Sequence, residues 1–245
     1  MFHKLEGATA VASVDVWFRG AEHEIDVYEV PGNNGDVRNI VFEHPFFSPQ
    51  GPGKIYCSDA PHQPHATDAS KFALFGAALA TWLLGRDRLP DALHLQDWHM
   101  GFYFILRQFA AGFKELRDIR TVFTIHNLAY QGIRPYSGHE SSLEAWFPGL
   151  HYDHDLIRDP RFHDCFNPMA AAIRLSDRVS TVSPTYASEI CLPSDPARGF
   201  IGGEGLEQDL QAVTIQGRLV GILNGCEYPQ KIGRKPAWTR VVSMM

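Results

Sequence analysis

The stretch Thr121-Val122-Phe123-Thr124-Ile125-His126-Asn127 decides the fold, because a run of β-branched and aromatic residues ends abruptly in two polar side chains. A run of this kind is typical of a buried strand. Similar apolar segments recur along the chain, at residues 92–96, 178–182 and 219–223. Segments with helical periodicity separate them, at residues 98–111, 168–175, 184–190 and 206–212. Strands that alternate with helices predict an α/β fold, with a parallel sheet and helices on both of its faces.

The first part of the chain has a different pattern. Apolar and polar residues alternate at 14–18 and 25–27, and a third strand is expected at 38–43 after a turn at 31–36. Residues 45–64 are rich in proline and glycine and predict a long loop. A strong helix is expected to follow. It begins near Thr67 or Asp68 and ends at Leu84, just before Gly85.

Three short signals predict where later helices begin and end. Asn167-Pro168 and Ser183-Pro184 each combine a capping residue with a proline at the first helical position, so a helix should begin at each pair. Gly112 is a plausible end for the helix that begins at Trp98.

Composition excludes several classes of protein. The 245 residues are 44% hydrophobic and 20% charged, with a formal net charge of −6, so neither a nucleic-acid surface nor an anionic membrane is an expected partner. No apolar run is long enough to span a bilayer, and residues 1–12 do not form a signal peptide. The four cysteines are widely spaced, which favours free thiols in a reducing cytoplasm over disulfides or zinc.

Polar side chains follow four of the expected strands. They belong to Gln96-Asp97-Trp98-His99, His126-Asn127, Ser183-Pro184-Thr185 and Asn224-Gly225. The carboxyl ends of parallel strands meet at one edge of a sheet, and ligands bind there. Carboxylate, amide and imidazole groups beside an indole suit sugar hydroxyls. The sequence therefore predicts a polar small-molecule site at this edge.

Some of the same positions allow other interpretations. Ser183 is better explained as a helix cap, whereas His126-Asn127 directly follows a buried run and favours a binding role. His94, Asp97 and His99 could suggest a metal site, but His94 and Asp97 lie on opposite faces of a strand, so hydrogen bonding or packing is favoured. Residues 202–205 form a glycine cluster that could bind an anion or simply form a flexible loop. The sequence has neither a Gly-x-Ser-x-Gly elbow nor a P-loop.

Several motifs together resemble bacterial glycogen synthases and plant starch synthases. Residues 124–132, TIHNLAYQG, are similar to the T-[VI]-H-N-[LI]-x-[YF]-Q-G stretch of that family. Residues 94–101, 177–186, 202–206 and 217–225 resemble four further family segments, in the same order. The resemblance covers residues 20–228 and is specific because the motifs occur together.

The resemblance implies one lobe of a two-lobed glycosyltransferase B fold, with a Rossmann-like sheet. It implies retaining transfer of glucose from ADP-glucose, or UDP-glucose, to the non-reducing end of an α-1,4-glucan, without a metal or other cofactor. His126 and Asp97 would be catalytic, His126 against the transferred glucose and Asp97 beside the sugar and acceptor. Trp98, Asn127 and Asn224 would shape the sugar pocket, and Tyr56 would close over the sugar.

The resemblance also implies parts that these residues do not contain. The family's first strand and its Lys-Thr-Gly-Gly-Leu loop have no counterpart here, and neither does its second lobe. We therefore expect residues 1–230 to be a partial N-terminal domain and residues 231–245 a linker or tail. We expect little activity from such a fragment. A non-catalytic glucan- or partner-binding remnant and an unrelated sugar-nucleotide enzyme are the alternatives, and the oligomeric state is open.

Overall fold

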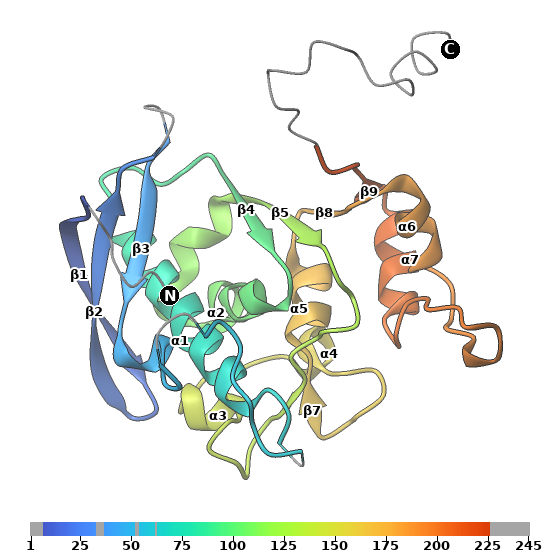
Figure 1. The fold of residues 1–245 in the computed structure, drawn as a ribbon, viewed down its shortest axis with the longest axis horizontal. Helices are drawn as coiled ribbons and strands as arrows, with labels where there is room; N and C mark the ends of the chain where they lie inside the picture. Colours follow the sequence, from blue (N-terminus) through green and yellow to red (C-terminus); the bar gives the residue numbers. More distant parts are fainter. Residues whose placement is uncertain (1–6, 33–36, 52–53, 62, 226–245) are drawn as a thin grey trace, which may run out of the picture.

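A computed structural model describes residues 7–32, 37–51, 54–61 and 63–225. The chain forms a three-stranded sheet in the order β1-β2-β3, a four-stranded sheet in the order β4-β5-β8-β9, and a two-stranded sheet of β6 and β7. Figure 1 shows the three-stranded sheet on one side of the helices and the four-stranded sheet beyond them. The predicted tail at 231–245 lies outside the described residues.

The first sheet confirms the alternating pattern of the early sequence. It contains β1 (Thr9–Phe18), β2 (Ala21–Val30) and β3 (Asn39–Glu43), all antiparallel. The apolar members of the alternation are buried, namely Val16, Phe18, Ile25 and Val27. The turn predicted at 31–36 falls largely on residues 33–36, which are outside the described part.

The second sheet is parallel, as predicted. Its strands are β4 (Ala92–Gln96), β5 (Arg120–Ile125), β8 (Arg178–Thr181) and β9 (Leu219–Gly221), and each pairs in parallel with the next. Helices in the connections flank the sheet (Figure 1). Parallel strands require such crossovers, and the helices they contain cover the sheet. Within the described ranges β4 pairs with β5 alone, so its other edge has no partner strand.

Most predicted helices are present. The longer ones are α1 (Ala66–Leu84), α2 (Gly101–Phe109), α5 (Pro168–Leu175), α6 (Pro184–Glu189) and α7 (Glu207–Ile215). The side chains of Asn167 and Ser183 accept hydrogen bonds from Ala170 N and Tyr186 N, which confirms both as N-caps. The remaining short elements are α3 (Leu143–Trp146), α4 (His154–Ile157), β6 (Arg134–Pro135), β7 (Cys165–Phe166), and 3₁₀ turns at Pro45–Phe47, Trp98–Met100, Ala111–Asp118 and Pro196–Arg198.

One helix boundary differs from the sequence prediction, and the cap of another helix was not predicted. Gly112 does not end a helix, because α2 ends at Phe109 and Gly112 lies inside the 3₁₀ segment 111–118. Helix α1 is capped from a distance, since the Asp59 carboxylate accepts hydrogen bonds from Thr67 N at 2.9 Å and Thr67 Oγ1 at 2.6 Å. Neither arrangement can be read from the local sequence pattern.

A short polar chain crosses the centre of the parallel sheet. His94 Nε2 lies 2.6 Å from Thr124 Oγ1, which in turn lies 2.5 Å from Ser180 Oγ. These residues come from β4, β5 and β8, and Thr124 and Ser180 are buried. Buried hydroxyls need such partners, because an unbonded one would be costly. His94 therefore has the hydrogen-bonding role that the sequence favoured.

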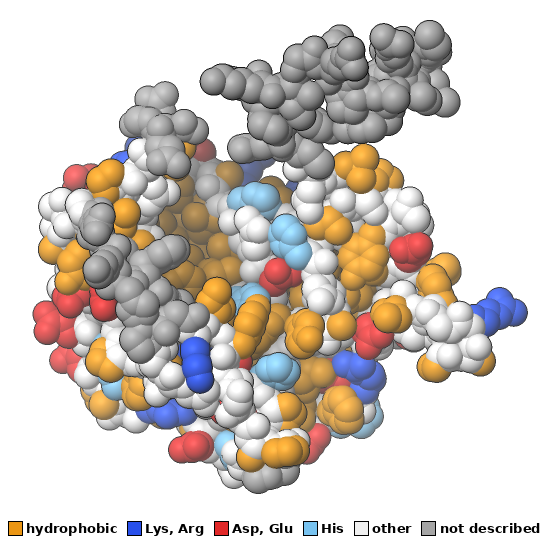
Figure 2. Space-filling model, in the orientation of Figure 1, with side chains coloured by type: hydrophobic (Ala, Val, Ile, Leu, Met, Phe, Trp, Pro, Cys, Tyr) orange, Lys and Arg blue, Asp and Glu red, His pale blue; other side chains and the backbone are white. Residues whose placement is uncertain are grey.

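The core lies between the two sheets. Helices α1, α2 and α5 pack on one another and bury aromatic side chains that include Phe102, Tyr103 and Trp146. Figure 2 shows a hollow lined by hydrophobic side chains between the antiparallel sheet and β4. None of the helices in the described part of the chain is long and apolar enough to cross a membrane.

Candidate functional site at the carboxyl edge of the parallel sheet

Asp97 joins the ends of two neighbouring strands. Its Oδ1 atom accepts hydrogen bonds from the backbone N–H groups of His126, at 2.8 Å, and Asn127, at 3.4 Å. Its own N–H donates to Thr124 O at 2.9 Å. The backbone of Asp97 has φ 56° and ψ 176°, a region that L-residues seldom occupy and that is often found at functional sites. Oδ2 has no hydrogen-bond partner among the described residues, so it can accept a ligand hydroxyl.

His126 lies exposed beside Asp97. Its Nε2 atom is 2.8 Å from Gln96 Oε1, a geometry that fits an Nε2–H group donating to the amide oxygen. In that tautomer Nδ1 is unprotonated and can accept a hydrogen bond. Asn127 is also exposed, and its Oδ1 accepts from Ala129 N at 3.0 Å, which leaves its amide N–H groups for a ligand.

Trp98 follows Asp97 at this edge of the sheet, and its side chain points into the interior. Its side chain is buried, and its ring centroid lies 4.6 Å from that of His99 and 5.3 Å from that of Phe72. Gly132 covers the indole so closely that an added Cβ atom would lie 2.1 Å from Trp98 Cε3. The indole therefore has little surface to offer a ligand, although it fixes the position of His99.

Tyr56 reaches the same edge from the long loop. Its hydroxyl lies 3.2 Å from His99 Nε2, and its side chain is largely exposed. Burial lowers the pKa of His99 below its usual value, against the opposing effect of the Asp97 carboxylate. Burial and the Asp97 charge both raise the pKa of Tyr56. The pair is therefore uncharged near neutral pH, and the neutral imidazole can accept the hydroxyl proton in a hydrogen bond.

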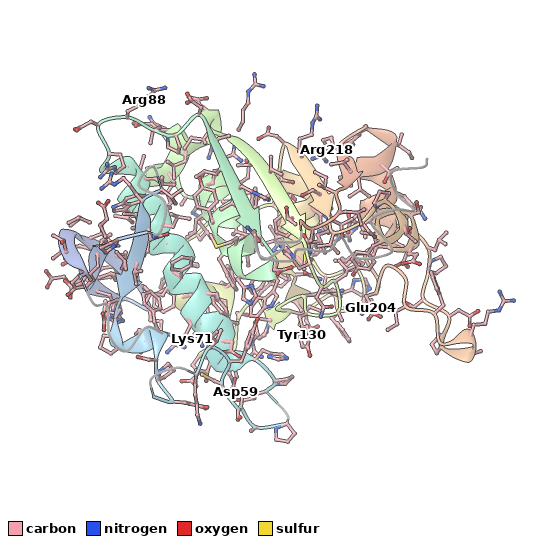
Figure 3. All side chains as sticks on the ribbon, turned by 45° about the horizontal axis from the view of Figure 1, so that its top comes forward. Asp59, Lys71, Arg88, Tyr130, Glu204 and Arg218 are labelled. Carbon is pink, nitrogen blue, oxygen red and sulfur yellow. The ribbon has the colours of Figure 1, made fainter. Side chains whose placement is uncertain are left out.

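Contacts from the last helices hold the loop after Asn127. Tyr186, in α6, accepts a hydrogen bond from Leu128 N at 3.2 Å. The Gln131 amide donates to Leu128 O and to Glu204 O, both at 3.1 Å. Figure 3 shows the neighbouring Tyr130 and Glu204 labelled on the same side of the molecule. The loop that carries Asn127 is thus fixed by the glycine-rich segment at 202–205.

That glycine-rich segment does not form a free anion site. The N–H groups of Gly202, Gly203 and Gly205 donate to Ser194 Oγ, Leu192 O and Glu207 Oε2, at 3.1, 2.7 and 3.0 Å. All three amides are already satisfied within the chain. The three glycine N–H groups are therefore not available to an anion, which favours the interpretation of this segment as an ordinary loop.

The structure brings together most, but not all, of the predicted residues. Asp97, His126 and Asn127 are in direct contact, and Tyr56 lies beside them through His99. Asn224 lies exposed beyond β9, at the same end of the sheet, and no hydrogen bond in the described residues connects it to the others. Figure 2 shows histidine and acidic side chains grouped near the middle of this face.

Gln96, His99 and Tyr186 were not selected from the sequence as site residues. Gln96 and His99 flank the Asp97-Trp98 pair, so their position at a strand end was the available signal. Tyr186 gave no comparable signal, because its approach to Leu128 depends on how α6 packs over the sheet. The described residues contain no group of His, Cys, Asp and Glu arranged to hold a metal ion.

Comparison with known proteins agrees with this architecture. The model of the starch synthase catalytic domain family matches residues 2–212. The glycogen synthase of Trichodesmium erythraeum (strain IMS101) is 36% identical over 203 residues, covering 82% of this chain and 35% of that protein. The glycogen synthase of Gloeobacter violaceus is 32% identical over 213 residues, covering 86% and 37%.

A solved structure shares the fold. The catalytic domain of starch synthase IV from Arabidopsis thaliana, bound to ADP and acarbose, matches with a TM-score of 0.67 and 27% identity, over 89% of this chain and 41% of that chain. The predicted α/β fold is thereby confirmed. The chain spans little more than a third of the length of the curated relatives described above. The extent of the family match shows that the chain belongs to the starch synthase catalytic domain family.

Proposed function

We propose that this chain provides the sugar side of a glycosyl-transfer site. The reaction is transfer of glucose from ADP-glucose, or UDP-glucose, to the non-reducing end of an α-1,4-glucan, with retention. The observation that carries the proposal is the Asp97–His126–Asn127 cluster. It joins a carboxylate on a strained backbone and an exposed imidazole at the ligand-binding end of a parallel sheet. The glycogen synthase relatives supply the substrate class.

The chemistry of a retaining transfer explains the residue types. Positive charge develops at the anomeric carbon, and preorganised acceptors such as Asp97 Oδ2 and His126 Nδ1 would stabilise it. Asn127 and Asn224 would bind sugar hydroxyls, Tyr56 would cover the sugar, and Trp98 would shape the pocket by holding His99 in place.

The leaving diphosphate needs cationic groups. In the described ranges no lysine or arginine is hydrogen-bonded to Asp97, His126 or Asn127. Lys71, which donates to the backbone next to Tyr56, is buried and paired with Asp68. We therefore expect little glucose transfer from the 245 residues by themselves.

The test measures glucose incorporation into glycogen from ADP-glucose. The 245-residue chain should show little turnover, and robust turnover would overturn that part of the proposal. In a full-length member of the family, the counterparts of Asp97→Asn and His126→Ala should lower turnover far more than they change folding. Asp91→Asn is the matched control, because this exposed carboxylate lies at the opposite end of β4 and, among the described residues, pairs with Arg88 alone. Wild-type turnover in either site variant would remove the assigned roles.

A non-catalytic glucan-binding function is the second candidate. It is favoured by the same observation, since the sheet edge has hydroxyl-binding groups but no cation bonded to them. Co-sedimentation of the chain with glycogen, without transfer, would support it. Loss of co-sedimentation in Asp97→Asn, but not in Asp91→Asn, would place the glucan at this edge, and no sedimentation at all would exclude this function.

A further inference from the structure

A fully buried ion pair lies at the start of α1. Asp68 and Lys71 are one helical turn apart, their side chains are 0% and 2% exposed, and Lys71 Nζ lies 2.9 Å from Asp68 Oδ1. Removing two charges from water is expensive, and apolar residues of similar volume often give equal or greater stability. Stability alone is therefore a weak explanation for this pair. Figure 3 shows Lys71 near one end of α1, with Asp59 in the loop close to that end.

The pair holds the backbone on both sides of Tyr56. Asp68 accepts hydrogen bonds from Cys57 N, at 3.0 Å to Oδ1 and 3.2 Å to Oδ2. Lys71 Nζ donates to the carbonyl oxygen of Ile55. One partner thus binds the residue after Tyr56, and the other binds the residue before it.

These two contacts hold the backbone from which the Tyr56 side chain extends. Ile55 and Tyr56 are both 57% exposed, so burial of their side chains does little to fix this part of the loop. The only side-chain hydrogen bond that Tyr56 makes in the described residues is the one to His99 Nε2, at 3.2 Å. The Tyr56 hydroxyl stays within reach of His99 Nε2 when the backbone of Ile55 and Cys57 keeps its position relative to α1.

We propose that Asp68 and Lys71 form a positioning pair, which fixes residues 55–57 on α1 and thereby holds Tyr56 over the edge that carries Asp97. The inference rests on the proposed function only for the identity of the ligand that Tyr56 covers. Neither Asp68 nor Lys71 touches that edge directly. Their effect passes through the backbone of Ile55 and Cys57.

The test uses variants that separate positioning from stability. Asp68→Val with Lys71→Met removes both charges together, so no unpaired charge remains buried, and removes both backbone anchors. Asp68→Asn with Lys71→Met keeps one anchor, because the asparagine oxygen can still accept from Cys57 N. Arg174→Met with Asp209→Val is the control, since it removes a partly buried ion pair between α5 and α7 that does not contact the loop.

The first measurement needs no ligand. Tyr56 is replaced by 3-fluorotyrosine, and its ¹⁹F resonance is recorded in each variant of the 245-residue chain. Loss of both anchors should move the resonance to the position of free 3-fluorotyrosine, and Asp68→Asn with Lys71→Met should give an intermediate shift. The control should leave the resonance unchanged. A native resonance in a folded Asp68→Val, Lys71→Met chain would overturn the inference. If that chain does not fold, the Asp68→Asn, Lys71→Met chain decides on the same criterion.

The second measurement is acarbose binding by calorimetry. Loss of the anchors should weaken binding about tenfold, the ratio that ~1.4 kcal/mol produces. Adding the same pair of changes to Tyr56→Ala should weaken binding no further, because the anchors act through Tyr56. Additive losses would overturn the positioning role. If the wild-type chain binds no acarbose, the proposed sugar site fails, and the ¹⁹F measurement still decides whether the ion pair positions Tyr56.

Discussion

Replacing Gly132 by alanine tests whether the sheet edge depends on the buried Trp98. Gly132 has φ +71°, and an added Cβ atom would lie 2.1 Å from Trp98 Cε3 and 2.6 Å from Cζ3. The indole cannot move away freely, because Phe72 and Phe102 pack around it with centroid distances of 5.3 and 6.3 Å. The substitution should therefore displace Trp98 and, with it, His99.

The expected loss has two parts. An L-residue in the left-handed region costs about 1–2 kcal/mol, and the lower entropy of the unfolded alanine chain offsets about 0.4–1 kcal/mol of that. Overpacking against the indole adds about 1–3 kcal/mol. Gly132→Ala should therefore lower the free energy of unfolding by about 1–5 kcal/mol.

Gly138 offers a matched control. It has φ +78°, and no atom lies within 4 Å of its added Cβ position. Gly138→Ala should carry the backbone cost alone, about 1 kcal/mol or less. The difference between the two variants isolates the contact with Trp98.

Urea unfolding followed by tryptophan fluorescence and circular dichroism measures both variants. A difference of more than about 1 kcal/mol between them, with unchanged m-values, would agree with the packing argument. Equal losses would refute it, because Gly132 would then matter only for its backbone conformation. In Gly132→Ala the histidine NMR signal of His99 should also shift, whereas Gly138→Ala should leave it in place.

Three further outcomes are expected. Asn167→Ala should lower the free energy of unfolding by about 3 kcal/mol, since it removes the cap on Ala170 N and two buried amide hydrogen bonds, and urea titration measures this. Burial lowers the pKa of His99, so below about pH 6.5 the unfolded chain binds more protons than the folded chain. The free energy of unfolding, measured by urea titration, should therefore fall as the pH falls below that value, and His99→Gln should make it less dependent on pH. Asp97→Asn should cost only about 1 kcal/mol of stability by urea titration, because asparagine has the same shape as aspartate and its side-chain oxygen still accepts from His126 N.

The sequence predicted the parallel sheet well because its signals are local. Residues 121–125 and 92–96 are short apolar runs between helical segments, and both are strands in the structure. Asn167 and Ser183 cap the helices that follow them, since a side-chain cap needs only residues a few positions away. Parallel strand ends share one edge by geometry, so Asp97 and His126 were expected at the same edge, where the structure places them.

The features that the sequence did not predict depend on distant contacts. Nothing in the residues around Thr67 indicates that Asp59 caps α1. Trp98 was expected to face a sugar, but its burial depends on Gly132, 34 positions away in the chain. The loop at 45–64 gave no sign that Asp68 and Lys71 would bind its backbone, because a charged pair at that spacing usually lies on the exposed face of a helix.

The hydrogen-bonded chain of His94, Thr124 and Ser180 has a direction, and the position of one proton on the His94 ring decides it. When His94 Nε2 is unprotonated it accepts from Thr124, and Thr124 then accepts from Ser180. When Nε2 carries hydrogen, both hydroxyls must turn to donate in the opposite direction. The tautomer of one exposed imidazole on β4 therefore sets the direction of the hydroxyl bonds on β5 and β8, and neutron diffraction, which locates hydrogen atoms, could observe that direction directly.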